Sequence, residues 1–142
     1  MKPAVFVDTD VIISSVISSR GASRMLIDSL EVVKTISNIS LVEIKKVSQR
    51  LQLSDKSLQA TLVKCECVSI DANNSRSKTR FGKYVVDEDD AHIVAGVVEA
   101  KLGILVTFNQ KDFKREFLKR DFEIIILSPG EMLQYLRGKN TI

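Results

Sequence analysis

Acidic side chains occur at four places where a buried segment is expected to end or a helix to begin. The candidates are Asp8, Glu43, Asp90 and Asp112. Asp8 closes the apolar run 4–7, and Asp90 ends an acidic group that starts at Asp87. Carboxylates that gather in one place repel each other, by about 4 kcal/mol for two charges roughly 4 Å apart at an effective dielectric near 20. Such a cluster persists only if the acids share protons or a cation neutralises them.

The chemistry of these side chains favours a hard metal ion. All four offer oxygen atoms, and the chain has only one His and two Cys. Oxygen ligands select Mg²⁺ or Mn²⁺. An ion held by carboxylates keeps several waters, binds a phosphate oxygen, lowers the pKa of an attacking water and stabilises the leaving oxygen. The four acids are therefore candidate metal ligands and candidate catalytic residues for phosphoryl chemistry.

The segment that must position Asp90 has a helical pattern. Ile93 and Val97 continue from Asp90 at helical spacing, so one face of this helix points into the protein. Gly103 is expected to end the helix, and residues 104–106 read as a short buried strand. Asp90 is thus predicted to stand at the start of a largely buried helix.

Predicted strands and helices alternate along the rest of the chain. Strands are expected at 4–7, 35–37, 68–70 and 122–127, and helices at 11–17, 22–32, 41–51, 54–63 and from 129 onward. Residues 71–83 read as a loop leading into a short helix, and a basic helix follows Phe113. This alternation implies a sheet covered on both faces. We predict a single domain, residues 1–142, with a three-layer α/β/α fold around a central, mainly parallel sheet.

In such sheets ligands bind at the carboxyl ends of the strands, which is where Asp8 is expected. Several polar residues also have ordinary structural explanations. Asp10 is expected to cap the helix that follows it. Ser40 and Glu43 form the S-x-x-E pattern of a capping box. His92 lies two residues after Asp90 and is turned by roughly 200° from it on the helix, which favours a packing or surface role.

Composition restricts the class of protein. Hydrophobic residues make up 44% and charged residues 27%, as in ordinary globular domains. No apolar run approaches the roughly 18 residues that span a membrane, and no signal-peptide pattern begins the chain, so we expect a cytoplasmic protein without membrane contact. Cys65 and Cys67 form a lone C-x-C pair, which favours buried reduced thiols over a zinc site.

Basic residues gather on both sides of the segment that carries Asp90. They are Arg76, Lys78, Arg80 and Lys83 before it, and Lys111, Lys114, Arg115, Lys119 and Arg120 after it. Such groups are often solvated helix faces. Beside a metal site they would also hold a nucleic-acid backbone. The net charge of +3 permits a nucleic-acid partner but does not by itself indicate one.

Four short motifs give the chain a resemblance to a known family. They are VFVDTDVIIS around Asp8, NISLVEI around Glu43, DDAHIVAGVVEAK around Asp90, and LVTFNQKDF near Asp112. In this order and over nearly the whole chain, they resemble the PIN-domain ribonucleases, most of all the VapC-like toxins of type II toxin–antitoxin systems. The resemblance implies the PIN fold, Mg²⁺ or Mn²⁺ as cofactor, and a metal-activated water that cuts RNA. It also implies an antitoxin protein as partner and a homodimer.

The same resemblance assigns the metal-binding acids. It implies Asp8, Glu43 and Asp90 directly. In many members a fourth acid stands at the position of Asn109, whereas this chain has its next acid, Asp112, three residues further on. Whether Asp112 or Asn109 fills the fourth position stays open: Asp112 could coordinate through water, or the site could use three acids. The family also often has Asn where this chain has Asp10.

Two other functions fit parts of the sequence. Asp8-Thr9-Asp10-Val11 matches the D-x-D-x-V motif of haloacid-dehalogenase-like phosphatases, in which Asp8 would be the nucleophile and Asp10 the general acid. That assignment leaves Glu43 and the TFNQKDF segment without a role. A non-catalytic PIN-like module that binds RNA or protein is the second alternative, and Asn109 is the residue that supports it.

Overall fold

The computed structural model describes residues 2–140, and its strands form one five-stranded parallel sheet. The strands are β1 (Ala4–Val7), β2 (Val33–Ser37), β3 (Cys65–Val68), β4 (Ile104–Val106) and β5 (Ile125–Leu127). Their order is β3-β2-β1-β4-β5, and every pair runs parallel. The chain therefore builds outward from β1 in one direction and then returns to β1's other side with β4.

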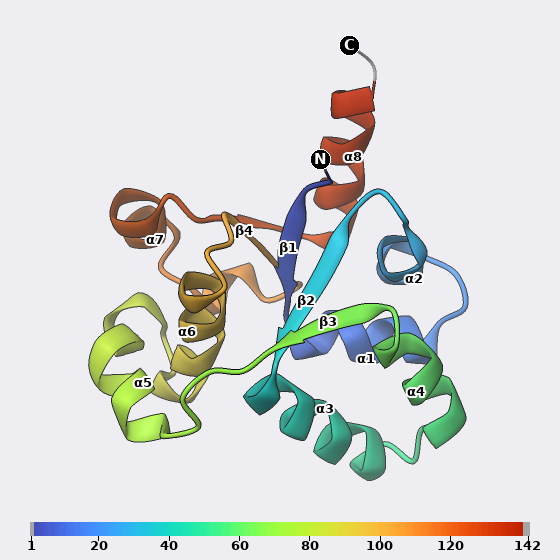
Figure 1. The fold of residues 1–142 in the computed structure, drawn as a ribbon, viewed down its shortest axis with the longest axis horizontal. Coiled ribbons are helices and arrows are strands. Elements are labelled where there is room, and N and C mark those ends of the chain that lie inside the picture. The colour runs from blue at the N-terminus through green and yellow to red at the C-terminus, as the bar shows by residue number, and fades with distance from the viewer. Residues whose placement is uncertain (1, 141–142) are drawn as a thin grey trace.

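Helices cover both faces of the sheet. They are α1 (Thr9–Ile17), α2 (Ala22–Asp28), α3 (Asn38–Arg50), α4 (Asp55–Leu62), α5 (Asn74–Phe81), α6 (Ala91–Glu99), α7 (Arg115–Phe122) and α8 (Pro129–Asn140), with short 3₁₀ turns at Gly82–Tyr84, Glu88–Asp90 and Gln110–Asp112. In Figure 1, α5, α6 and α7 lie on one side of the strands, and α1, α2 and α4 lie on the other. The predicted three-layer α/β/α class is confirmed, with a sheet that is parallel throughout.

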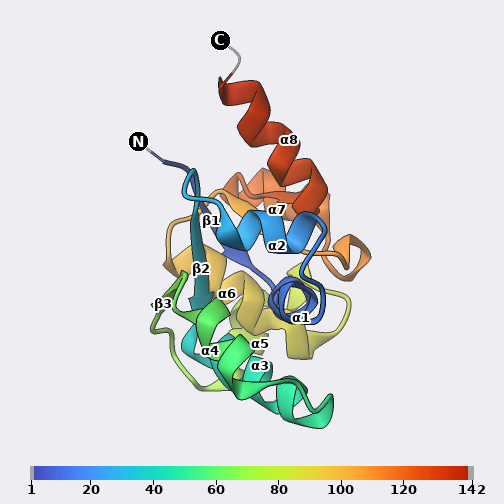
Figure 2. The same cartoon turned by 90° about the vertical axis from the view of Figure 1, so that its right-hand side faces the viewer.

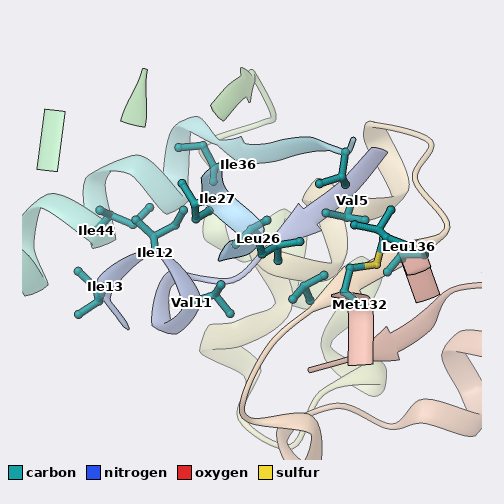
Figure 3. Packing of buried hydrophobic residues seen from close by; sticks show 14 of the residues in the cluster. Val5, Val11, Ile12, Ile13, Leu26, Ile27, Ile36, Ile44, Met132 and Leu136 are labelled. Carbon is teal, nitrogen blue, oxygen red and sulfur yellow. The ribbon is translucent and has the colours of Figure 1, made fainter. Parts of the chain in front are cut away.

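Alternation along β1 divides the core into two clusters. Val5 and Val7 belong to a cluster with side chains of α1, α2, α3 and α8, whereas Phe6 belongs to one with α5, α6 and α7. Figure 3 shows the first cluster, with Val5 near Met132 at the end formed by α8. The side chains of Val5, Phe6 and Val7 are all fully buried. A strand covered on both faces is expected to be apolar at every position, as this one is.

Close packing of α6 on β1 depends on Gly96. A Cβ atom added to Gly96 would lie 2.5 Å from Cε2 of Phe6, a distance that real side chains do not reach. The glycine therefore leaves the space into which the Phe6 ring fits. This contact fixes the distance between the helix that follows Asp90 and the strand that precedes Asp8.

Several predicted boundaries differ from the structure. The segment 71–83 is mostly helical, since α5 covers Asn74–Phe81. The third strand begins at Cys65, earlier than expected. Both thiols are free, but Cys65 is only half-buried and Cys67 is exposed, so the expectation of two buried thiols is wrong. The last strand is confined to Ile125–Leu127 because α7 continues to Phe122.

α8 begins with the predicted cap and extends away from the rest of the molecule at the end opposite α3 (Figure 2). The backbone N–H of Glu131 donates to Ser128 Oγ (3.1 Å), and the Ser128 N–H donates to Glu131 Oε1 (2.8 Å). This is a complete capping box. None of the helices in residues 2–140 is long and apolar enough to cross a membrane.

Candidate functional site

A crevice of about 470 Å³ opens at the carboxyl ends of the strands. It is lined by Asp8, Thr9, Asp10, Ile13, Ser14, Ile17, Ser18, Glu43, Val47, Asp90, Asn109 and Asp112. The crevice lies where the strand order reverses, between β1 and β4, which is the usual place for a ligand in an open parallel sheet. All four acids singled out from the sequence line it, although they come from four separate segments.

Asp8 is held by hydrogen bonds on both of its carboxylate oxygens. Its Oδ1 accepts from the backbone N–H of Thr9 (2.8 Å), which makes Asp8 the N-cap of α1. Its Oδ2 accepts from the hydroxyl of Thr107 (2.9 Å), the residue that follows β4. Burial, together with the negative charge of Asp10, raises the pKa of Asp8 to about 7. Asp8 is thus rigidly placed and retains its proton unusually strongly.

Asp10 does not cap α1 as predicted, because Asp8 takes that position. Instead, Asp10 Oδ2 accepts hydrogen bonds from the backbone N–H of Phe108 (3.0 Å) and from Nδ2 of Asn109 (3.0 Å). The Thr107 hydroxyl lies 3.4 Å from the same oxygen. Asp10 therefore fastens the turn after β4 to the start of α1, and burial raises its pKa.

Glu43 is free of the capping role that its S-x-x-E pattern predicts. α3 begins at Asn38, and its cap is Ser37, whose Oγ accepts from the backbone N–H of Ser40 (3.0 Å). Glu43 lies one full turn further on and faces the crevice. Its Oε2 lies 3.3 Å from His92 Nε2, and this hydrogen bond lowers the pKa of Glu43.

His92 makes a contact in the site that the sequence did not predict. It is buried, as a packing role predicts, but it also contacts a candidate metal ligand. His92 lies two residues after Asp90, roughly 200° around the helix, and its side chain reaches Glu43 on α3. A histidine beside an acidic cluster, on an otherwise apolar helix, was the only signal available.

Asp90 presents a side chain that its own helix does not use. It occupies the N-cap position of α6 but makes no capping hydrogen bond. Its neighbours take the other roles: Asp87 caps the preceding turn by accepting from the Asp89 N–H (3.0 Å), and Asp89 pairs with Lys78 (3.0 Å). Burial raises the pKa of Asp90 to about 6, and the charges of Asp8 and Asp112 add to this effect.

Backbone hydrogen bonds hold the Asp112 segment against the Asp90 segment. The N–H of Val86 donates to the carbonyl of Asp112 (2.9 Å), and the N–H of Lys114 donates to the carbonyl of Tyr84 (2.9 Å). Asp112 reaches the crevice from this clamp. Asn109 lines the crevice too, but its amide is bound to Asp10. Of the two candidates for the fourth position, only Asp112 offers a carboxylate.

The donor set suits a hydrated hard cation. Its side chains offer only oxygen to the crevice, and Asp8 and Asp90 have raised pKa values partly because other carboxylates face them. Within residues 2–140, no three His, Cys, Asp or Glu side chains form a ready-made metal cage. Mg²⁺ does not require one, since it usually keeps several waters and binds one or two carboxylates directly.

Comparisons with known proteins agree with the fold. A family model described as PIN domain matches residues 4–111. No curated protein matches the chain in sequence. A toxin–antitoxin complex from Klebsiella pneumoniae has a similar fold, with a TM-score of 0.64 and 18% identity over 88% of this chain and 97% of that chain.

Two further solved structures are similar. VapBC2 from Rickettsia felis, bound to a promoter DNA fragment, has a TM-score of 0.58 and 16% identity over 88% of this chain and 98% of that chain. VapC20 from Mycobacterium tuberculosis, a toxin that cleaves the Sarcin-Ricin loop, has a TM-score of 0.52 and 17% identity over 85% of this chain and 98% of that chain. At these identities the likeness concerns the fold alone.

Proposed function

The chain belongs to the PIN-domain family, and from this premise we propose that it is a Mg²⁺- or Mn²⁺-dependent endoribonuclease. It would cut RNA phosphodiester bonds with a metal-activated water. The observation that supports this most strongly is the convergence of four carboxylates, from four separate segments, on one crevice. The resemblance of all four motifs to PIN-domain ribonucleases points to the same reaction.

In this proposal Asp8, Glu43 and Asp90 hold the ion, and Asp112 acts as the fourth acid. The bound ion supplies an activated water and stabilises the leaving oxygen. Thr107 orients Asp8 through its hydroxyl, and His92 keeps Glu43 turned toward the crevice. Hydrogen bonds of this kind fix the direction in which a ligand oxygen points and support metal affinity.

We further propose that the protein is the toxin of a toxin–antitoxin pair. The solved structures with a similar fold include a toxin–antitoxin complex, VapBC2, and VapC20, a toxin that cleaves the Sarcin-Ricin loop. An antitoxin that blocks the acidic crevice, a homodimer and a cytoplasmic location complete the proposal, as the family resemblance implies.

The phosphatase alternative loses its general acid. Asp10 Oδ2 accepts hydrogen bonds from the turn after β4, and its Oδ1 is buried without a hydrogen-bond partner among the described residues. Asp10 therefore fastens the turn after β4 to α1, a structural role that the phosphatase motif does not require. One observation still supports the alternative of a non-catalytic binding module. Where many relatives have an acid, this chain has Asn109, whose amide is bound to Asp10.

Incubation of a mixed pool of single-stranded and structured RNA with purified protein, in Mg²⁺, Mn²⁺ or EDTA, tests the proposal. We expect cutting that needs metal and disappears in Asp8→Asn and Asp90→Asn. Glu31→Gln, an exposed acid outside the crevice, is the matched control and should cut normally. Cutting that survives EDTA or either crevice substitution would refute the assignment. RNA binding without cutting would favour the non-catalytic module.

A further inference from the structure

A second, larger hollow of about 860 Å³ adjoins the acidic crevice. It is lined by the continuous segment from Phe108 to Phe117, and we call it the aromatic groove. It shares Asn109 and Asp112 with the crevice, so it opens directly beside the carboxylates.

The groove exposes two aromatic rings among polar and charged side chains. Phe108 is 49% exposed and Phe117 is 43% exposed, while Phe113 between them is buried and anchors the segment. Exposing phenylalanine side chains to water is unfavourable. Two exposed rings in one hollow therefore indicate a binding surface. The guanidinium of Arg120 lies 4.8 Å from the centroid of the Phe117 ring and supports one of its sides.

Phe108 is held firmly in place next to the acids. Its backbone N–H donates to Asp10 Oδ2, as does the side chain of Asn109 one residue later. The next turn, Gln110–Asp112, is fastened to α8 because Gln110 Nε2 donates to Glu131 Oε1 (2.7 Å). The ring is thus presented by a backbone that the site itself fixes, which reduces the entropy cost of binding to it.

The charges of the groove match a polyanion. Lys111, Lys114 and Arg115 line it, against Asp112 and Glu116. Lys111 and Lys114 are exposed and make no ion pair within residues 2–140. Cations placed between exposed aromatic rings are the usual way to bind single-stranded nucleic acid, since bases stack on the rings and phosphates contact the cations.

We propose that the aromatic groove binds the unpaired RNA strand on one side of the bond to be cut, with bases stacked on Phe108 and Phe117 and phosphates on Lys111 and Lys114. This inference rests on the proposed ribonuclease function and adds a requirement to it. Bases in a duplex are already stacked on each other, so the nucleotides on the groove side must be unpaired. The protein therefore selects its substrate by the absence of pairing on that side.

Fluorescence anisotropy in EDTA, with a labelled unstructured 12-nucleotide RNA and the same strand in a duplex, tests the groove without any cutting. Phe108→Ala and Phe117→Ala should each weaken single-strand binding roughly 5- to 150-fold, without changing its salt dependence. Phe108→Tyr, which keeps a ring, should bind normally. Lys111→Ala should reduce the slope of log affinity against log salt by about 0.7.

Leu30→Ala and Lys56→Ala are matched controls, since both side chains are exposed outside the groove. Unchanged RNA binding by both Phe variants would overturn the inference even if the protein cuts RNA, and the exposed rings would then fit an apolar partner peptide instead. Ring-dependent, single-strand-specific binding by a protein that never cuts would support the groove while refuting the ribonuclease. The two failures are thus separate.

Discussion

Replacing Asp8 by Asn is expected to stabilise the metal-free protein above neutral pH while removing its activity. Asp8 keeps its proton up to about pH 7 in the folded state, whereas the same carboxyl releases it near its ordinary pKa of 3.8 when the chain unfolds. Between those two values the folded state binds more protons, so the free energy of unfolding falls as the pH rises. An amide has no proton to lose and avoids this penalty.

The penalty follows from the size of the shift. A change from 3.8 to about 7 is roughly three units, and at about 1.4 kcal/mol per unit the upper limit is on the order of 4 kcal/mol. Solvent reaches part of Asp8 and reduces this value, so we expect about 2 kcal/mol. For a chain of this length that corresponds to roughly 4–8 °C in melting temperature.

The substitution should preserve the local hydrogen bonds. Asn caps helices about as well as Asp, so the introduced carbonyl can accept from Thr9, and the introduced NH₂ group can donate to the Thr107 hydroxyl. Loss of native contacts is therefore small, and the electrostatic gain should dominate.

Thermal unfolding in EDTA at pH 5 and pH 8 measures the effect. The unchanged protein should lose stability between the two, whereas Asp8→Asn should lose less, with Asp10 and Asp90 still contributing, and be the more stable at pH 8. Saturating Mg²⁺ should stabilise the unchanged protein but not Asp8→Asn, because only the former binds the ion fully. The unchanged protein should then be the more stable of the two at pH 8. An Asp8→Asn protein that is less stable than the unchanged one at pH 8 in EDTA would refute the reasoning.

Three further predictions follow from the contacts around the crevice. Gly96→Ala forces a Cβ against the Phe6 ring and should cost about 1–3 kcal/mol by thermal unfolding, whereas Gly138→Ala, which meets no atom within 4 Å, should cost nothing; equal effects would contradict the packing account. His92→Leu should raise the Mg²⁺ concentration for half-maximal RNA cutting about tenfold, because Glu43 loses its partner; an unchanged requirement would exclude a positioning role. Cutting at limiting Mg²⁺ should decline from pH 8 to pH 6, since carboxyls with pKa values of about 7 and about 6 must lose protons to bind the ion, and a flat profile would count against these acids as ligands.

The sequence was sufficient for the fold class and for bringing the acids together. Asp8 and Asp90 each adjoin an apolar run. Such runs identify strands and buried helices from the local sequence alone, without knowledge of the segments that pack against them. Parallel strands place their carboxyl ends at one edge, so an acid after β1 and a threonine after β4 must lie close together. Figure 1 shows how β1 and β2 both lead to helices at this end of the sheet.

Capping and helix ends were harder to predict, because several residues nearby compete for the same role. Ser37 and Ser40 both suit the start of α3, and the backbone selects Ser37. Gly103 was the obvious end for α6, yet the helix ends at Glu99 and Lys101 adopts the left-handed conformation at φ +58°. Local chemistry permits both choices in each case, and only tertiary packing decides between them.

The His92–Glu43 contact could not be predicted from spacing alone. Helical geometry gives the angle between His92 and Asp90, but not which neighbouring element stands at that angle. The same limit applies to Asp10, whose partners lie 98 and 99 positions away along the chain. Contacts between distant segments require the assembled fold.

Crystals of the protein soaked in Mn²⁺ would show, through the anomalous scattering of the ion, whether the crevice binds a metal. We expect a peak in the acidic crevice, coordinated by oxygens of Asp8 and Asp90, and no such peak in Asp90→Asn crystals soaked in the same way. A crevice without Mn²⁺, or an ion bound only by other residues, would contradict the claim that these acids form a metal centre.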